Sequence, residues 1–175
     1  MIKTVFIVLA VAVAAFLLFA ATRPDTFAVE RSITISAPPA KVHALIDDLR
    51  AYNTWNPYAK KDPQMKLTYR GAPKGVGAGF DFEGNKESGK GSIDVLESDA
   101  GKVVMALRMT SPMEADNRVV YKLVPKGDAT EVSWTMGGAV PYMAKVIHLV
   151  INIDKMVGKD FEQGLSDLKS LAEKP

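Results

Sequence analysis

The sequence contains no cysteine, and its 175 residues include only two histidines, His43 and His148. The lack of cysteine excludes a disulfide framework, a thiolate nucleophile, and zinc or iron–sulfur sites with thiolate ligands. Two histidines are too few for a histidine-based metal site unless carboxylates complete it. We therefore predict no metal and no cofactor, and we find no catalytic motif that stands on its own.

An excess of charge of one sign is also missing. The chain has 22 basic and 20 acidic residues, which are interspersed and leave a formal net charge of +2. It shows no basic stripe of the kind that nucleic-acid-binding proteins carry. We therefore expect no nucleic-acid partner. The part of the chain that follows the N-terminal segment, about 150 residues, is long enough for a single well-packed domain.

One long apolar run stands at the N-terminus, from Val5 to Ala21. As a helix it would be about 26 Å long, close to the hydrocarbon thickness of a bilayer. The alternative is a cleaved signal peptide, but the apolar core of such a peptide usually has about 7–15 residues and ends in a small-x-small cleavage site. Leu18-Phe19-Ala20 is a poor site of that kind. The sequence therefore favours an uncleaved membrane anchor.

The residues around this run indicate a topology and a set of domain boundaries. Lys3 precedes the run and Arg23 follows it, and long domains cross membranes largely regardless of such charges. We predict a single-pass protein of the bacterial inner membrane with its domain on the periplasmic or outer face. The expected divisions are a transmembrane anchor at 1–23, a linker at 24–27 and a folded domain at 28–175.

A period of two dominates residues 65–137. Phe80 and Phe82, for example, alternate with charged residues, and turn signals such as Gly84-Asn85 and Lys126-Gly-Asp128 separate the alternating stretches. A further alternating stretch runs from Phe27 to Ile35. The pattern predicts an antiparallel sheet of about seven strands with one apolar face.

The C-terminal residues 142–173 predict one long amphipathic helix. Apolar residues recur there with helical spacing at Met143, Ile147, Val150, Ile151, Val157, Phe161, Leu165 and Leu168. The sheet is the only broad apolar surface on which this stripe could lie. Gly158 and Gly164 fall inside the helix, where each costs about 1 kcal/mol relative to alanine. Such glycines indicate a bend or the close approach of a neighbour.

Asp154 falls in the middle of this stripe on a helical wheel. A buried carboxylate must be paired, hydrogen-bonded or protonated. One interpretation is a polar group inside a ligand cavity. The other is a structural carboxylate, which caps a helix start at a break near Asn152 or pairs with an arginine or tryptophan.

The apolar face of the predicted sheet is rich in methionine, a residue that fills irregular space and adapts to ligands of variable shape. This face is either a soft core or one wall of an apolar cavity between a curved sheet and the long helix. We favour the cavity. The predicted ligand-binding residues are Tyr69, Phe80, Phe82, Met105, Leu107, Met109, Tyr121, Trp134, Met136, Ile147, Ile151 and Asp154.

Several stretches are similar to a known family. They are Arg31–Val42, Trp55–Tyr58, Gly75–Gly79, Gly89–Ile93, Thr130–Trp134 and Gly158–Leu165. On these stretches the chain resembles the START-like, or SRPBCC, superfamily, in its polyketide cyclase/dehydrase-like branch, over nearly all of residues 28–173. The resemblance implies an α+β helix-grip fold, in which a curved antiparallel sheet grips a long C-terminal helix. It also implies a cavity for lipids, polyketides or other apolar molecules, and it carries no catalytic residue to a matched position.

The leading hypothesis is a membrane-anchored domain that binds a hydrophobic small molecule or lipid. The first alternative is a cyclase- or dehydratase-like enzyme, for which Asp154 is the only candidate that the periodicity supplies. The second is a protein-interaction domain whose core is filled by its own side chains. The sequence names no protein partner.

Overall fold

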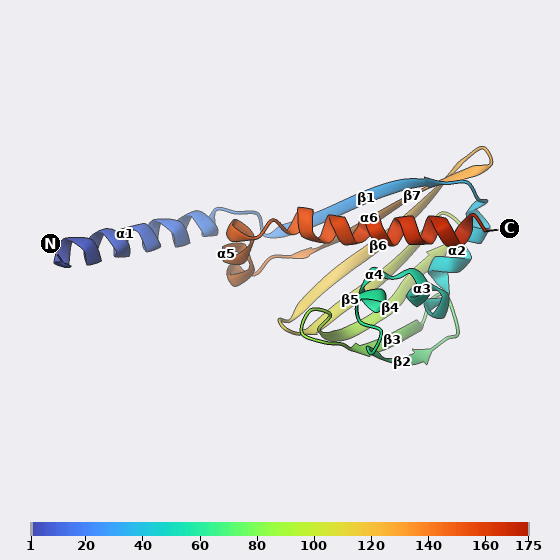
Figure 1. Cartoon of the computed structure of the whole chain (residues 1–175), viewed down its shortest axis with the longest axis horizontal. Helices are drawn as coiled ribbons and strands as arrows, with labels where there is room; N and C mark the ends of the chain where they lie inside the picture. The colour runs from blue at the N-terminus through green and yellow to red at the C-terminus, as the bar shows by residue number, and fades with distance from the viewer. Residues whose placement is uncertain (1, 175) are drawn as a thin grey trace.

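The computed structural model describes residues 2–174, and it consists of one extended helix followed by one α+β domain (Figure 1). The helix, α1 (Ile2–Ala21), is long and apolar enough to cross a membrane, and nearly all of it is exposed. A signal sequence would have the same features. In the domain, one antiparallel sheet curves around the C-terminal helix α6 (Ile153–Ala172), as the helix-grip prediction requires.

The sheet has seven strands in the order β1-β7-β6-β5-β4-β3-β2, and all neighbours are antiparallel. Their bounds are β1 (Thr26–Ile35), β2 (Lys66–Gly71), β3 (Ala78–Glu83), β4 (Lys90–Asp99), β5 (Lys102–Ser111), β6 (Ala115–Lys126) and β7 (Ala129–Ala139). The predicted sheet of about seven strands is therefore confirmed. β1 begins inside the predicted linker, because Thr26 and Phe27 already pair with Ala139 and Gly138 of β7.

Three short helices connect β1 to β2: α2 (Pro39–Asp47), α3 (Leu49–Trp55) and α4 (Pro57–Lys61). Side-chain caps separate them. Asp48 accepts hydrogen bonds from the first backbone N–H groups of α3, and Asn56 does the same for Tyr58 in α4. All three helices pack against α6, so they cover one side of the space between α6 and the sheet.

The prediction of one helix over residues 142–173 is wrong. The chain forms α5 (Tyr142–Val150) and α6, with extended backbone at Ile151 and Asn152 between them. The Asn152 side chain accepts a hydrogen bond from the backbone N–H of Lys155 at 2.9 Å and so caps α6. An asparagine side chain competes with the helical backbone in this way, and it favours a helix start over a helix interior.

This break divides the apolar stripe into two parts. In α6 the stripe is buried against the sheet at Val157, Phe161, Leu165 and Leu168. In α5 and the break it is not buried: Met143 is 66% exposed, Val150 is 78% exposed and Ile151 is 44% exposed. The prediction that Met143 faces the core is therefore wrong, because α5 takes a different direction from α6 (Figure 1).

Gly164 lies where a neighbour approaches α6 closely. A Cβ at this position would stand 2.8 Å from Cζ3 of Trp134 and 2.9 Å from Cδ of Pro57. The Trp134 ring stacks on Phe161 of α6, with 3.9 Å between ring centroids. The predicted close approach is confirmed, and the approaching groups are side chains of the sheet and α4.

Candidate ligand-binding site

A cavity of about 330 Å³ lies between the inner face of the sheet and α6. The sheet contributes mostly apolar side chains, and helices α3, α4 and α6 supply the opposite wall. The lining residues are Tyr52, Asn56, Tyr58, Met65, Phe80, Phe82, Glu87, Ser88, Ile93, Leu107, Met109, Asn117, Val119, Trp134, Met136, Met156, Val157 and Phe161.

Half of the predicted ligand-binding residues line this cavity: Phe80, Phe82, Leu107, Met109, Trp134 and Met136. Three others lie in the core around it. Met105 and Tyr121 are fully buried, and the half-buried Tyr69 accepts a hydrogen bond from the side chain of Asn53 at 3.1 Å. They therefore support the cavity wall from behind.

The sequence-based prediction missed the helical wall. Tyr52, Asn56 and Tyr58 come from the aromatic segment at 51–58, which the sequence pattern predicts to plug the edge of the core rather than to gate a cavity. Val157 and Phe161 belong to the apolar stripe of α6 but were not included in the predicted site. Their spacing was a usable signal, whereas nothing in the sequence alone set the position of α3 and α4 relative to the sheet.

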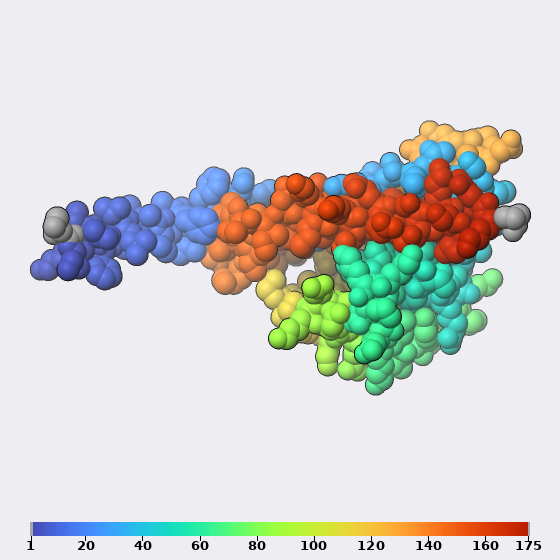
Figure 2. All heavy atoms as spheres, in the orientation of Figure 1, coloured from blue at the N-terminus to red at the C-terminus, as the bar shows by residue number. Residues whose placement is uncertain are grey.

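One end of the cavity lies where α1 joins the domain. Asn117 near the start of β6 pairs with Gly138 near the end of β7, and Gly138 also pairs with Phe27 at the start of β1. Met156, in the first turns of α6, lines the same cavity. Figure 2 shows the surface hollowed at this end, beneath α5 and the start of α6.

The polar groups of the cavity wall are nearly all uncharged. Burial raises the pKa of Tyr52 to about 12, and it also raises the pKa values of Tyr58 and Tyr121 above the ordinary tyrosine value. The Tyr121 hydroxyl donates to the Tyr52 hydroxyl at 3.4 Å. Among residues 2–174, Glu87 is the only charged residue in the lining, and none of these residues offers a cation to a ligand there.

Two buried polar atoms of lining residues have no hydrogen-bond partner within residues 2–174. They are the indole nitrogen of Trp134 and Oδ1 of Asn117. The first is a donor only, and the second is an acceptor. Unsatisfied buried polar atoms are costly, so a neutral acceptor and a neutral donor on a bound molecule would complement the two side chains.

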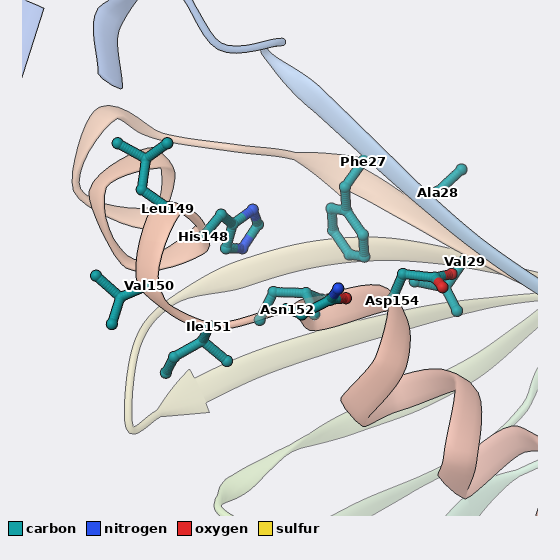
Figure 3. A pocket seen from close by; sticks show the side chains of 10 residues that line it. Phe27, Ala28, Val29, His148, Leu149, Val150, Ile151, Asn152 and Asp154 are labelled. Atoms are coloured by element: carbon teal, nitrogen blue, oxygen red, sulfur yellow. The ribbon is translucent and has the colours of Figure 1, made fainter. Parts of the chain in front are cut away.

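A second hollow, of about 450 Å³, is an open groove between the start of β1 and the α5–α6 junction (Figure 3). Two predicted site residues, Ile151 and Asp154, line this groove rather than the apolar cavity. Ile147 lines neither. All three are displaced from the cavity because the helix breaks before Asn152 and α5 leaves the direction of α6.

Asp154 is exposed, so the prediction that it is a buried carboxylate in the stripe is wrong. Its Oδ2 lies 3.0 Å from Nη2 of Arg31, and this bond holds the pKa of Asp154 below its ordinary value. The carboxylate also lies in the first turn of α6, where the helix dipole favours negative charge. Of the two interpretations of Asp154, the structure therefore agrees with the second, a structural carboxylate that pairs with an arginine beside a helix break.

Arg31 is the residue that links β1 to α6. Its guanidinium contacts Asp154 and also donates from Nε to Glu162 at 2.9 Å, while Nη1 donates to the backbone carbonyl of Glu30. The sequence pattern suggests a solvated strand start for Arg31, but the side chain is half-buried under the helix. The signal available in the sequence was an arginine in phase with the apolar residues of the strand.

Comparison with known proteins identifies the family. The sequence profile of the family described as polyketide cyclase / dehydrase and lipid transport matches residues 26–173. Comparison with curated proteins gives no significant match.

Solved structures with the same fold come from bacteria and plants. A protein from Chromobacterium violaceum is 19% identical with a TM-score of 0.60, and the match covers 87% of this chain and 100% of that one. A protein from Thermobifida fusca is 27% identical with a TM-score of 0.58, covering 81% and 90%. Norcoclaurine synthase from Thalictrum flavum, in complex with dopamine and hydroxybenzaldehyde, is 12% identical with a TM-score of 0.61, covering 86% and 89%. With its helix-grip fold and its match over residues 26–173, the chain belongs to the polyketide cyclase/dehydrase and lipid transport family.

Proposed function

We propose that the protein is a membrane-anchored binding protein for an uncharged hydrophobic small molecule or lipid. The observation that carries this proposal is the cavity of about 330 Å³ between the sheet and α6. Its volume falls in the range of small-molecule sites, about 300–1,000 Å³, and such sites are mostly apolar with a few convergent polar groups. The wall of this cavity has that composition.

The chemistry of the wall supports an uncharged ligand. A carboxylate or phosphate inside the cavity would lose its hydration without gaining a cationic partner, which is costly. Neutral oxygen or nitrogen atoms on an apolar frame would instead find the Trp134 indole N–H, Asn117 and the protonated tyrosine hydroxyls. We therefore expect a ligand such as a neutral lipid or an uncharged polyketide-like ring system.

The proposal includes the membrane anchor. In it, residues 1–23 stay in a bacterial inner membrane, residues 24 and 25 link them to β1, and the domain that starts with β1 at Thr26 binds the ligand on the periplasmic face. The support is the length and apolarity of α1, and the attachment of α1 at the end where the cavity surface is hollowed. A ligand that partitions into lipid would be delivered close to its site.

The two alternatives lose support. An enzyme of the cyclase or dehydratase type would need an acid or base at the ligand. The predicted candidate, Asp154, lies in the open groove with its charge held by Arg31, which leaves Glu87 as the carboxylate in the cavity lining. A protein-interaction domain would need a core filled by its own side chains, which the open cavity does not favour.

The test is binding of the neutral fluorophore Nile red to the full chain in lipid nanodiscs, together with native mass spectrometry of the purified protein. Leu107→Trp places a large side chain in the cavity, and the matched Leu96→Trp places one on an exposed position of β4. We expect Leu107→Trp to weaken binding at least about tenfold, which corresponds to about 1.4 kcal/mol, and Leu96→Trp to leave it unchanged. Equal binding by both variants would overturn the proposal, as would the absence of any bound or bindable apolar molecule.

A further inference from the structure

We infer that α5 is a membrane-contact surface, which lies in the bilayer interface beside α1 and holds the open end of the cavity against the lipid. This inference rests on the anchor of the proposed function and adds a second membrane element in the domain itself. The partner is the lipid bilayer, and the contact is apolar.

The first observation is an unpaired apolar surface. Within residues 22–174, more than half of the exposed large apolar side chains fall between residues 142 and 156, a short part of the chain. They are Tyr142, Met143, Val150, Ile151 and Met156. Figure 3 shows the Val150 side chain pointing away from β1. Exposed apolar side chains that gather in one part of the chain indicate a site of contact with a protein or a membrane.

The second observation identifies the membrane as the occupant. The Tyr142 hydroxyl donates a hydrogen bond to the backbone carbonyl of Leu17 at 2.9 Å. Leu17 lies about one turn from the end of α1, so it would stand near the headgroup level if α1 spans the bilayer. Tyrosine is enriched at this level because its ring is apolar and its hydroxyl is polar. The start of α5 therefore lies at the same membrane depth as this turn of α1.

The direction of α5 fits this position. In Figure 1, α5 runs across the line of α1 and α6, so it lies along the membrane surface when α1 crosses it. Lys145 of α5 is buried and pairs with Asp25 just after α1, at 2.5 Å. This ion pair fixes α5 to the segment that leaves α1. Amphipathic helices that lie in the interface bury one apolar face at the boundary between headgroups and acyl chains.

The exposed apolar group also reaches the cavity through Met156, which lies in the first turns of α6. Met156 belongs both to the exposed apolar group and to the cavity lining. At Met156, the apolar surface that contacts lipid would therefore join the apolar wall of the cavity. An apolar ligand could pass between the bilayer and the cavity with little exposure to water.

The test uses single cysteines, because the natural chain has none. Val150→Cys and Met143→Cys are labelled with the environment-sensitive fluorophore NBD in the full chain and reconstituted into phosphatidylcholine vesicles. Val124→Cys, at an exposed position of β6, is the matched control, and Leu9→Cys reports on α1. We expect the NBD labels at 143 and 150 to show blue-shifted emission, quenching by nitroxide-labelled acyl chains and protection from iodide. The label at 124 should emit as NBD does in water, which we call a water-like label.

Each other result has a distinct meaning. Water-like labels at 143 and 150, with a lipid-quenched label at 9, would overturn the inference and leave the anchor intact. Protection from iodide without quenching by nitroxide lipids would indicate a protein partner and would also overturn it. A water-like label at 9 would refute the anchor of the proposed function, and the inference with it. A second variant adds a charge to the proposed surface. Val150→Asp should make the NBD label at 143 water-like, and Val124→Asp should leave its emission unchanged.

Discussion

The guanidinium of Arg31 in β1 lies directly against Gly158 in α6, where a Cβ would stand 1.9 Å from Nη2. Asp154 and Glu162, the two carboxylates that Arg31 binds, are each four residues from this glycine. Residues with this spacing share one helix face. The missing side chain at Gly158 therefore leaves the space in which Arg31 reaches both carboxylates, and it explains a glycine inside a helix.

Gly158→Ala should destabilise the domain by about 1–3 kcal/mol, the usual cost of overpacking. The intrinsic preference of a helix for alanine over glycine, about 1 kcal/mol, acts in the opposite direction but does not remove the clash. The measurement is urea unfolding of the full chain in mild detergent. Gln163→Ala, at an exposed position of the same helix, is the control and should stay within about 0.5 kcal/mol.

A double-mutant cycle isolates the cause of this effect. In an Arg31→Ala background the clash is gone, so Gly158→Ala should be neutral or stabilising. If the substitution costs as much in that background as in the natural chain, the contact with Arg31 is not the reason for the glycine.

Asp154→Asn should change how stability depends on pH. The pKa of Asp154 is lowered in the folded chain by its hydrogen bond to Arg31. The folded state therefore binds this proton less readily than the unfolded chain, and the stabilisation is present above the ordinary value of 3.8 and lost as pH falls through the lowered one. We expect the variant to have a lower Tm than the natural chain at pH 7 and nearly the same Tm near pH 2.

The control for this pH effect is Asp128→Asn, since no ion pair involves Asp128 within residues 2–174. It should leave the difference in Tm between pH 7 and pH 2 unchanged. A parallel loss in both variants would show that general charge, rather than the pair with Arg31, is responsible.

The buried tyrosines should remain protonated in alkaline solution. Burial raises the pKa of Tyr52 to about 12, and that of Tyr121 is also raised. The folded state therefore holds these protons more tightly than the unfolded chain. The contribution of these tyrosines to stability is constant below about pH 10 and falls as pH rises further. At pH 11, absorbance at 295 nm should report fewer tyrosinates in the folded chain than in the chain unfolded in urea, which exposes all five tyrosines.

Tyr52→Phe tests the assignment of this effect. The folded variant should give nearly the same absorbance at pH 11 as the natural chain, because Tyr52, with a pKa of about 12, contributes little tyrosinate there. A decrease in the folded absorbance would mean that Tyr52 ionises normally and is not sealed in the core.

The N-terminal segment should remain on the mature protein. The intact mass of the chain recovered from membranes should include residues 1–23, and the chain should resist extraction with alkaline carbonate. A mass that lacks the apolar run would identify a cleaved signal peptide. The run from Val5 to Ala21 has the length of a span, which is the physical basis of this expectation.

Local patterns in the sequence were sufficient for the architecture. Each strand or helix that packs on the core needs an apolar residue wherever its side chain is buried. This requirement produces the alternation along 65–137 and the apolar stripe at Val157, Phe161, Leu165 and Leu168. The sheet and α6 follow from it. The same periodicity also identified Phe80, Trp134 and Met136 as inward-facing, and these residues line the cavity.

The structure was needed to establish the helix break, and only the tertiary structure decided the partner of Asp154 and the second wall of the cavity. The apolar spacing continues through Ile151, and the capping bond of Asn152 is a local competition that hydrophobic periodicity does not register. Arg31 and Asp154 are 123 residues apart, so their contact depends on how α6 crosses β1. Tyr52 and Tyr58 reach the cavity because α3 and α4 pack against α6, and packing between elements distant in sequence is set by the shape of the whole core.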